Sequence, residues 1–184
     1  GTGKTVTITS SYSGTDVNNY TITDQDSTTA DISAKALTAT ASAANKTYDG
    51  TTTATTTLTF SGLIGSETLG QTVGSTFNNK NVGTDKTVTV NSITLVDGTG
   101  LASNYSITNH PTITADVAVK ALTATASTAN KVYDGTTTAT TTLTFTGLVG
   151  TETLGQTVGS TFNNKNVGTG KTVTVNSITL ANGT

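Results

Sequence analysis

Residues 45–53 read NKTYDGTTT and residues 130–138 read NKVYDGTTT, which is the same text displaced by 85 positions. The agreement extends well beyond this motif, because residues 35–99 and 120–184 align without a gap and differ at only eight positions. A repeat of this length is too long for one turn of a solenoid, and it is long enough for a small domain with its own core. The sequence therefore predicts a tandem array of small domains, each marked by one Tyr-Asp-Gly motif.

The repeat divides the chain into three expected parts. Residues 1–34 match the end of a repeat, residues 35–119 form a complete one, and residues 120–184 form most of the next. Since the chain opens in the middle of a repeat, we expect it to be a piece of something longer. A cyclic pattern has no fixed starting point, so a second division stays open, with a leading strand at 1–14 followed by units at 15–99 and 100–184.

The composition and the spacing of apolar residues indicate β structure. Apolar residues make up 33% of the chain, charged residues 11%, and threonine alone roughly a quarter. The apolar residues lie in short runs with the period of two that is typical of strands, and no amphipathic helix pattern occurs. Threonine suits an exposed strand face, because its branched Cβ favours extended backbone and its hydroxyl stays hydrated. We expect an all-β fold of small tandem domains, each a two-sheet sandwich or a β-grasp-like sheet, arranged as an elongated rod.

The longest expected strand, residues 86–95, changes face midway. Val88 and Val90 fall on one face by strict alternation, whereas Ile93 and Leu95 fall on the other. We predict a β-bulge or a strong twist at Asn91-Ser92, because one extra residue restores a single apolar face. The core expected for the complete repeat consists of Leu37, Tyr48, Leu58, Phe60, Leu63, Leu69, Val73, Phe77, Val88, Val90, Ile93, Leu95, Tyr105, Ile107, Ile113 and Val117.

The charge pattern argues against two classes of partner. The net charge is −2, and the nine basic residues are all lysines that lie apart from one another. Nucleic acids and anionic membranes both attract clustered positive charge, so we expect neither as a partner. No apolar run is long enough to cross a bilayer, and without cysteine the chain forms no disulfide and offers no thiolate to a metal. The expected partners are neighbouring repeats of the same chain.

Several linked motifs recur in both copies. They are Lys-Ala-Leu-Thr (35–38 and 120–123), Lys-x-Tyr-Asp-Gly-Thr-Thr (46–52 and 131–137) and Phe-x-x-Lys-Asn-Val-Gly-Thr-x-Lys-Thr-Val-Thr-Val (77–90 and 162–175). This set resembles the YDG-type repeats of large bacterial surface adhesins, which include haemagglutinin-like exoproteins of the two-partner secretion class and biofilm-matrix adhesins. The resemblance implies a secreted protein at the bacterial cell surface. In such a protein the repeats would form a stalk or spacer that supports adhesion or biofilm formation, while other domains contact the host or matrix surface.

The sequence offers no catalytic residues, and we do not expect an enzyme. The only histidine, His110, corresponds to Gln25 in the leading part, and a general base that one copy lacks is improbable in a duplicated module. No cofactor is expected either. The alternative is a module that binds a glycan, a matrix polymer or calcium through its loops. Ca²⁺ binds six or more oxygen ligands, and the carboxylates to be considered are those of Asp24, Asp26, Asp31, Asp97 and Asp116.

We interpret the two Tyr-Asp-Gly motifs as structural turns. In this interpretation the tyrosine anchors the end of a strand, the aspartate accepts hydrogen bonds from nearby backbone N–H groups, and the glycine supplies a positive φ. The residues concerned are Tyr48, Asp49, Gly50, Tyr133, Asp134 and Gly135. An amide crosslink between a lysine and an asparagine, such as Lys46 with Asn79, is a further option that the intact mass would reveal.

Overall fold

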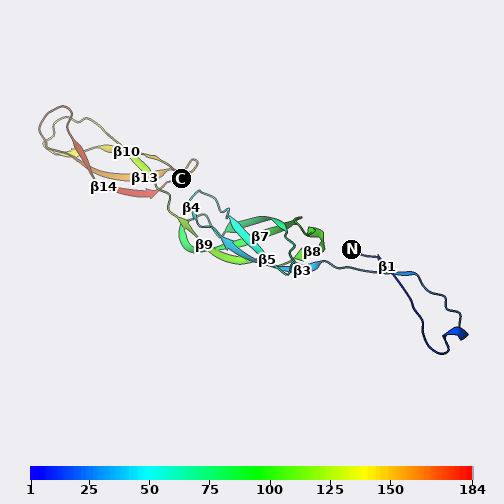
Figure 1. Ribbon diagram of the computed structural model, residues 1–184. Coiled ribbons are helices and arrows are strands. Elements are labelled where there is room, and N and C mark those ends of the chain that lie inside the picture. Colours follow the sequence, from blue (N-terminus) through cyan, green and yellow to red (C-terminus); the bar gives the residue numbers. More distant parts are fainter. Residues whose placement is uncertain (184) are drawn as a thin grey trace. The chain divides into compact units, whose positions relative to one another are not determined.

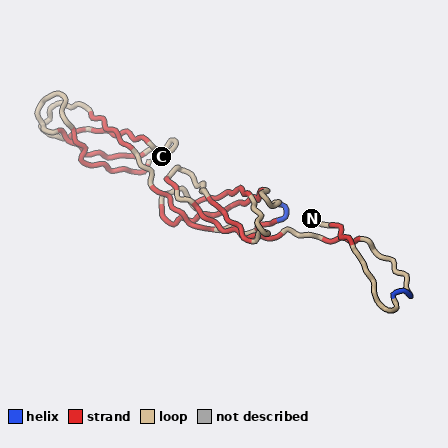
Figure 2. The backbone as a smooth tube through the Cα atoms, in the orientation of Figure 1, coloured by secondary structure: helices blue, strands red, loops and turns tan. Residues whose placement is uncertain are grey.

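The computed structural model describes residues 1–183, and Thr184, the last residue of the second expected copy, lies outside them. Strands joined by loops make up these residues, as Figures 1 and 2 show. Two single-turn 3₁₀ helices, η1 (Val17–Asn19) and η2 (Ala102–Asn104), are the only helices in the described chain, and neither could cross a membrane. The all-β class expected from the sequence is confirmed, in the form of several small sheets.

The chain forms two compact units whose limits differ from those of the repeat. The first consists of Gly1–Ala44, Thr53–Phe77 and Thr87–Thr114, and the second of Asn45–Thr52, Asn78–Lys86 and Ala115–Thr184. Three stretches of the first copy therefore belong to the second unit: Asn45–Thr52, Asn78–Lys86 and the end of the copy from Ala115. One of these stretches carries the first Tyr-Asp-Gly motif.

In the first unit, a three-stranded arrangement joins the beginning of the copy to its end. β3 (Lys35–Ala43) pairs antiparallel with β5 (Thr56–Ser61) and, through its first three residues, parallel with β8 (Tyr105–Ile107). β3 buries Leu37 and Ala39 and leaves Thr38 and Thr40 exposed, as the period of two predicts. Ala39 packs with Leu58 and Val90 at the centre of the core, and Ala41, Phe60, Val73, Ile93 and Ile107 surround them.

The hairpin of β6 (Gly70–Phe77) and β7 (Gly83–Val96) contains a β-bulge. Gly74 lies opposite Ser92 and Ser75 lies opposite Val90, so Asn91 is the extra residue, and its Nδ2 donates to Thr76 Oγ1 at 3.0 Å. The bulge predicted at Asn91-Ser92 is confirmed. It shifts the alternation by one, so that the four apolar side chains of β7 (Val88, Val90, Ile93 and Leu95) lie opposite alternate residues of β6 and share one face.

A second parallel pairing closes the four-stranded sheet β4-β9-β7-β6. β4 (Lys46–Thr47) runs parallel to β9 (Thr112–Ala118), with Lys46 opposite Val117 and Thr47 opposite Ala118. Val117 and Val88 are among the most deeply buried side chains of the protein. The sequence gives no signal for either parallel pairing, because each joins short segments about 70 residues apart.

The second unit repeats the antiparallel pairs of the first copy. β10 (Thr123–Thr128) pairs with β12 (Thr141–Thr146), and β13 (Leu154–Phe162) pairs with β14 (Val173–Asn182) and with the short β11 (Thr138–Ala139). The β13–β14 hairpin has the same register shift, at Gly159/Ser160, and Asn176 donates to Thr161 Oγ1 at 3.0 Å. The bulge is therefore a property of the repeat.

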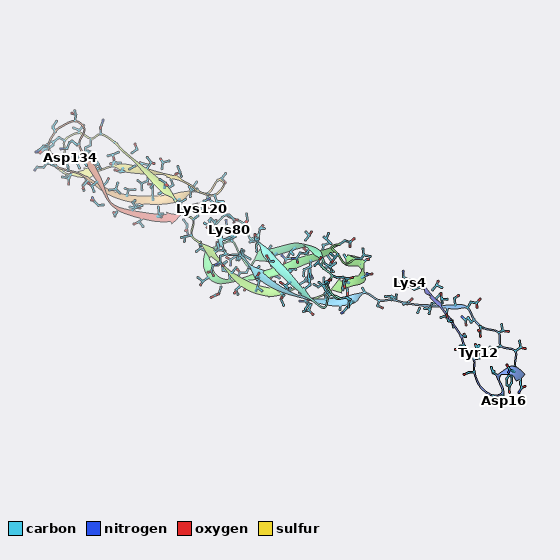
Figure 3. The ribbon with its side chains drawn as sticks, in the orientation of Figure 1. Lys4, Tyr12, Asp16, Lys80, Lys120 and Asp134 are labelled. Carbon is cyan, nitrogen blue, oxygen red and sulfur yellow. The ribbon has the colours of Figure 1, made fainter. Side chains whose placement is uncertain are left out.

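The leading segment has no core of its own. β1 (Lys4–Thr7) and β2 (Ser27–Ala30) form a two-stranded ribbon in which every strand residue is exposed. Tyr12 and Asp16 lie in the long connection between the two strands, as labelled in Figure 3. An isolated two-stranded ribbon is marginally stable in water, so this segment is the least stabilised part of the first unit.

Truncation of Leu58 tests the core of the first unit. Leu58 is 5% exposed and packs against Ala39 and Val90, so Leu58→Ala should lower the free energy of unfolding by about 2–5 kcal/mol. Thr59→Ala, at the exposed neighbouring position, should change it by less than about 0.5 kcal/mol. Urea denaturation followed by circular dichroism measures both, and equal effects of the two substitutions would contradict this core.

Candidate functional site

The Tyr-Asp-Gly motif of the first copy forms a turn that is held by one carboxylate. Asp49 Oδ1 accepts hydrogen bonds from the backbone N–H and the hydroxyl of Thr51, both at 2.9 Å, and from Lys46 Nζ at 2.7 Å. Lys46 Nζ also donates to the backbone carbonyl of Thr51 at 2.9 Å. Gly50 has a φ of 77°, a conformation that side chains disfavour. The carboxylate and the ammonium group together hold both sides of the turn.

The second copy forms the same turn from the corresponding residues. Asp134, labelled in Figure 3, accepts from the N–H and the hydroxyl of Thr136 at 2.9 Å, and Lys131 Nζ lies 2.8 Å from its Oδ1. Gly135 has a φ of 79°. Because the geometry recurs in a copy with different surroundings, it follows from the local sequence alone.

These contacts lower the pKa of both aspartates from 3.8 to about 2. The largest cause is the hydrogen bond from the lysine of the same turn, and the backbone N–H of the threonine adds to it. Both donors favour the charged carboxylate over the neutral acid.

The two tyrosines of the motif differ in their surroundings. Tyr48 is half-buried and its hydroxyl donates to the carboxylate of Glu152, whose Oε1 also lies 3.5 Å from Lys80 Nζ. All three residues belong to the second unit, and Lys80 is labelled in Figure 3. The hydrogen bond raises the pKa of Tyr48 and lowers that of Glu152. Tyr133, the counterpart of Tyr48, is 58% exposed.

A different tyrosine contacts the corresponding glutamate of the first copy. Tyr105 is buried, donates to the Glu67 carboxylate, and accepts a hydrogen bond from the backbone N–H of Ile64 at 3.2 Å. The hydrogen bond to Glu67 raises the pKa of Tyr105. The loop that carries Ile64 and Glu67 is thereby fixed to the core of its own copy.

Comparison with known protein families identifies the family to which this chain belongs. The model of the YDG domain matches residues 33–115 and again residues 118–184. The chain belongs to the YDG domain family. No curated protein and no solved structure matches it.

The acidic residues considered for calcium each take part in a hydrogen bond within the YDG chain. Asp31 accepts from the N–H of Gly3 at 2.8 Å, Asp24 accepts from the Tyr12 hydroxyl, and Asp97 accepts from the N–H of Ala102 at 2.7 Å. Asp116 accepts from the N–H of Asp85 at 2.9 Å. The remaining candidate, Asp26, accepts from the N–H of Ile8 through its backbone carbonyl at 3.0 Å. Within residues 1–183, no three acidic, histidine or cysteine residues form a group that could hold a metal ion.

The lysine and asparagine considered for a crosslink have other neighbours. Lys46 Nζ contacts Asp49 and Thr51, whereas Asn79 Oδ1 accepts from Lys86 Nζ at 2.6 Å. His110 is exposed. The Lys46 ammonium group therefore stabilises the turn of its own motif, and the Asn79 side chain belongs to the connection between β6 and β7.

Sequence reasoning missed the residue that closes the first YDG repeat. The Asn109 side chain accepts from the N–H of Ala39 at 2.9 Å and donates to the Ala39 carbonyl at 2.7 Å, as a neighbouring strand would. Asparagine is ordinary in a loop, so its type carried no signal. The position following a short β-strand was the only available cue.

A cleft of about 730 Å³ lies beside the second Tyr-Asp-Gly turn and is lined by Lys131, Tyr133 and Phe162 among others. In the first copy the corresponding residues are covered. β4 pairs there with β9, and Phe77, the counterpart of Phe162, is buried. The second copy shares only the residues that correspond to 35–99, which do not include a counterpart of β9. The cleft does not by itself indicate a ligand.

Acid should weaken these turns. A carboxylate whose pKa is lowered on folding stabilises the protein fully above the unfolded value and loses that contribution as the pH falls through the folded value. For Asp49 and Asp134 this interval runs from 3.8 down to about 2. The double variant Asp49→Asn/Asp134→Asn should be less stable at pH 6 and should lose less stability between pH 4 and pH 2.5 than the unmodified protein. Urea midpoints at pH 6, 4 and 2.5 measure this, and equal pH dependence of the two proteins would contradict it.

Proposed function

We propose that this chain is a structural stalk or spacer segment of a secreted bacterial surface adhesin, in which it supports adhesion or biofilm formation. The observation that carries this proposal is the tandem arrangement of two YDG domains with nearly identical text. Repeats of nearly identical sequence are expected in a spacer, because the number of repeats then sets the length of the protein. They are unexpected where each copy binds a different ligand.

The physical character of the repeat supports a mechanical role. Long antiparallel pairs such as β6–β7 and β13–β14 supply rows of backbone hydrogen bonds, and the exposed faces of the strands are rich in threonine. Such a surface stays hydrated without carrying much charge, which suits a segment that is exposed along its length. We further propose that each small β domain is a sandwich or β-grasp-like module and that successive domains form an elongated rod.

The composition of the chain supports the proposed location outside the cell. The absence of cysteine and methionine removes the two side chains that oxidise most easily, which suits a long-lived protein outside the cell. The partners of the chain would be neighbouring YDG repeats, and other domains of the adhesin would contact the host or matrix surface. We propose no catalytic activity, no nucleic-acid partner and no insertion into a membrane.

Replacement of the repeats tests the spacer role. In a bacterium that displays the adhesin, residues 33–184 are replaced by an unrelated β-repeat segment of equal length. Adhesion should be preserved, because a spacer contributes only the distance over which it extends from the cell. Deletion of one repeat should reduce adhesion in proportion to lost reach. Adhesion is measured by cell counts on the target surface, with surface display matched by antibody labelling. Loss of adhesion in the equal-length replacement would contradict the spacer role.

A second candidate is direct binding of a glycan, a matrix polymer or calcium. The observation that favours it is the exposure of Tyr12 and Tyr20 in the leading segment, at 52% and 72%, because sugars stack on exposed aromatic rings. Thermal unfolding with added CaCl₂ and with a chelator tests the calcium form of this candidate. A spacer without a calcium site should melt at the same temperature in both, whereas a bound ion would raise the melting temperature.

A further inference from the structure

Three segments of the second unit meet around the first Tyr-Asp-Gly turn. They are the turn itself, the loop that carries Lys80, and the loop of the next copy from Gly147 to Glu152. Tyr48 and Lys80 both direct their polar ends at the Glu152 carboxylate, so a neutral donor and a cation share one acceptor. This contact joins residues that are 104 and 72 positions apart in the sequence.

The glycine of the turn also contacts this loop. A Cβ atom placed on Gly50 would lie 2.8 Å from Val149 Cγ1 and 3.8 Å from Val149 Cβ. The absence of a side chain at this position therefore leaves room for an aliphatic residue of the loop. The loop is folded so that one turn presents both contact residues. Val149 and Glu152 are three positions apart, and the N–H of Glu152 donates to the Val149 carbonyl at 3.0 Å.

The repeat supplies an internal comparison. Gly135 has the same φ as Gly50, but a Cβ placed on it would have nothing within 4 Å, and Tyr133 is 58% exposed where Tyr48 is half-buried. On the loop side, Ile64 is 55% exposed while its counterpart Val149 is half-buried. The same residues are thus covered where a turn and a loop of adjacent copies meet and exposed where they do not.

We propose that Tyr48, Gly50 and Lys80 form a docking surface for the Gly-Leu-Val-Gly-Thr-Glu loop of the following YDG domain. The partner that fits this surface is a loop with an aliphatic residue for the glycine notch and a glutamate three positions later. Tyr133, Gly135 and Lys165 form the same surface in the second copy, which would receive the loop of a further YDG domain. This inference rests on the proposed spacer role for its purpose in the cell, and the contact itself is testable separately.

The glutamate of the loop has the capacity for this role. In the first copy, one carboxylate oxygen of Glu67 accepts from Tyr105 and fixes the loop to its own domain. Glu152 shows that one carboxylate oxygen of the same loop accepts from the preceding domain. A carboxylate has two oxygens and accepts several hydrogen bonds, so one glutamate per repeat can link the core of its own domain to the turn of the domain before it.

Paired cysteines test the contact, because the protein has no cysteine of its own. Cβ atoms 3.8 Å apart are suited to a disulfide, so Gly50→Cys/Val149→Cys should form an intramolecular disulfide when oxidised glutathione accepts the electrons and protons of the two thiols. The matched control is Gly135→Cys/Val149→Cys, which places its cysteine at the same φ without Val149 within reach.

Thiol titration and intact mass of the monomer give the result. We expect nearly complete loss of free thiols in the first variant and little loss in the control. Equal crosslinking of both, or none in the first, would overturn the docking surface. Either outcome would leave the spacer role intact, because replacement of the repeats tests that role on cells.

A second pair of variants avoids any change at glycine. Tyr48→Phe removes the donor to Glu152 and should lower the urea midpoint of the second unit, whereas Tyr133→Phe should leave the midpoint unchanged. Glu152→Gln should bring the alkaline titration of one tyrosine back toward the ordinary range, as followed by ultraviolet absorbance. Identical midpoints for the two tyrosine variants would contradict the docking surface.

Discussion

A single extra residue in β7 decides whether the repeat has a core. In a regular strand without the bulge, strict alternation would place Val88 and Val90 on one face and Ile93 and Leu95 on the other. The bulge brings all four to one face, opposite alternate residues of β6, and the Asn91 side chain bonds to Thr76 across the hairpin. With so few apolar residues in the chain, neither pair alone would exclude water from the sheet. Asn176 serves the second copy in the same way.

Local patterns were readable from the sequence, and distant pairings were not. The all-β class and the bulge follow from the spacing of apolar residues. Among the expected core residues, Leu37, Leu58 and Val90 are buried, but the sequence pointed equally to Leu95 and Ile113, which are only half-buried. Ala39, Ala54 and Ala115 are buried and were missed, because alanine is common on both faces of a strand. The parallel pairings and the contact of Tyr48 with Glu152 join distant segments, and no local period encodes them.

The Tyr-Asp-Gly motif combines two tasks that its residues divide between them. Asp49 faces inward to its own turn, where it holds Thr51 and Lys46, and this arrangement recurs unchanged around Asp134. Tyr48 and Gly50 face the other way, toward Glu152 and Val149. The aspartate is therefore explained by the local backbone, whereas the tyrosine and the glycine are also explained by a neighbour. A motif of three consecutive residues can thus serve stability and recognition at once.

The pairing of β4 with β9 has a consequence for how the protein is made. Lys46 meets Val117 only after the intervening 70 residues have been synthesised, and β3 likewise waits for β8. A chain that emerges from a ribosome or a pore in order therefore holds each YDG domain open until nearly its whole length is out. During that interval the equivalent strand of another YDG copy would compete with β9 for pairing with β4. The order of emergence, rather than any difference in sequence, then determines which copy closes which domain.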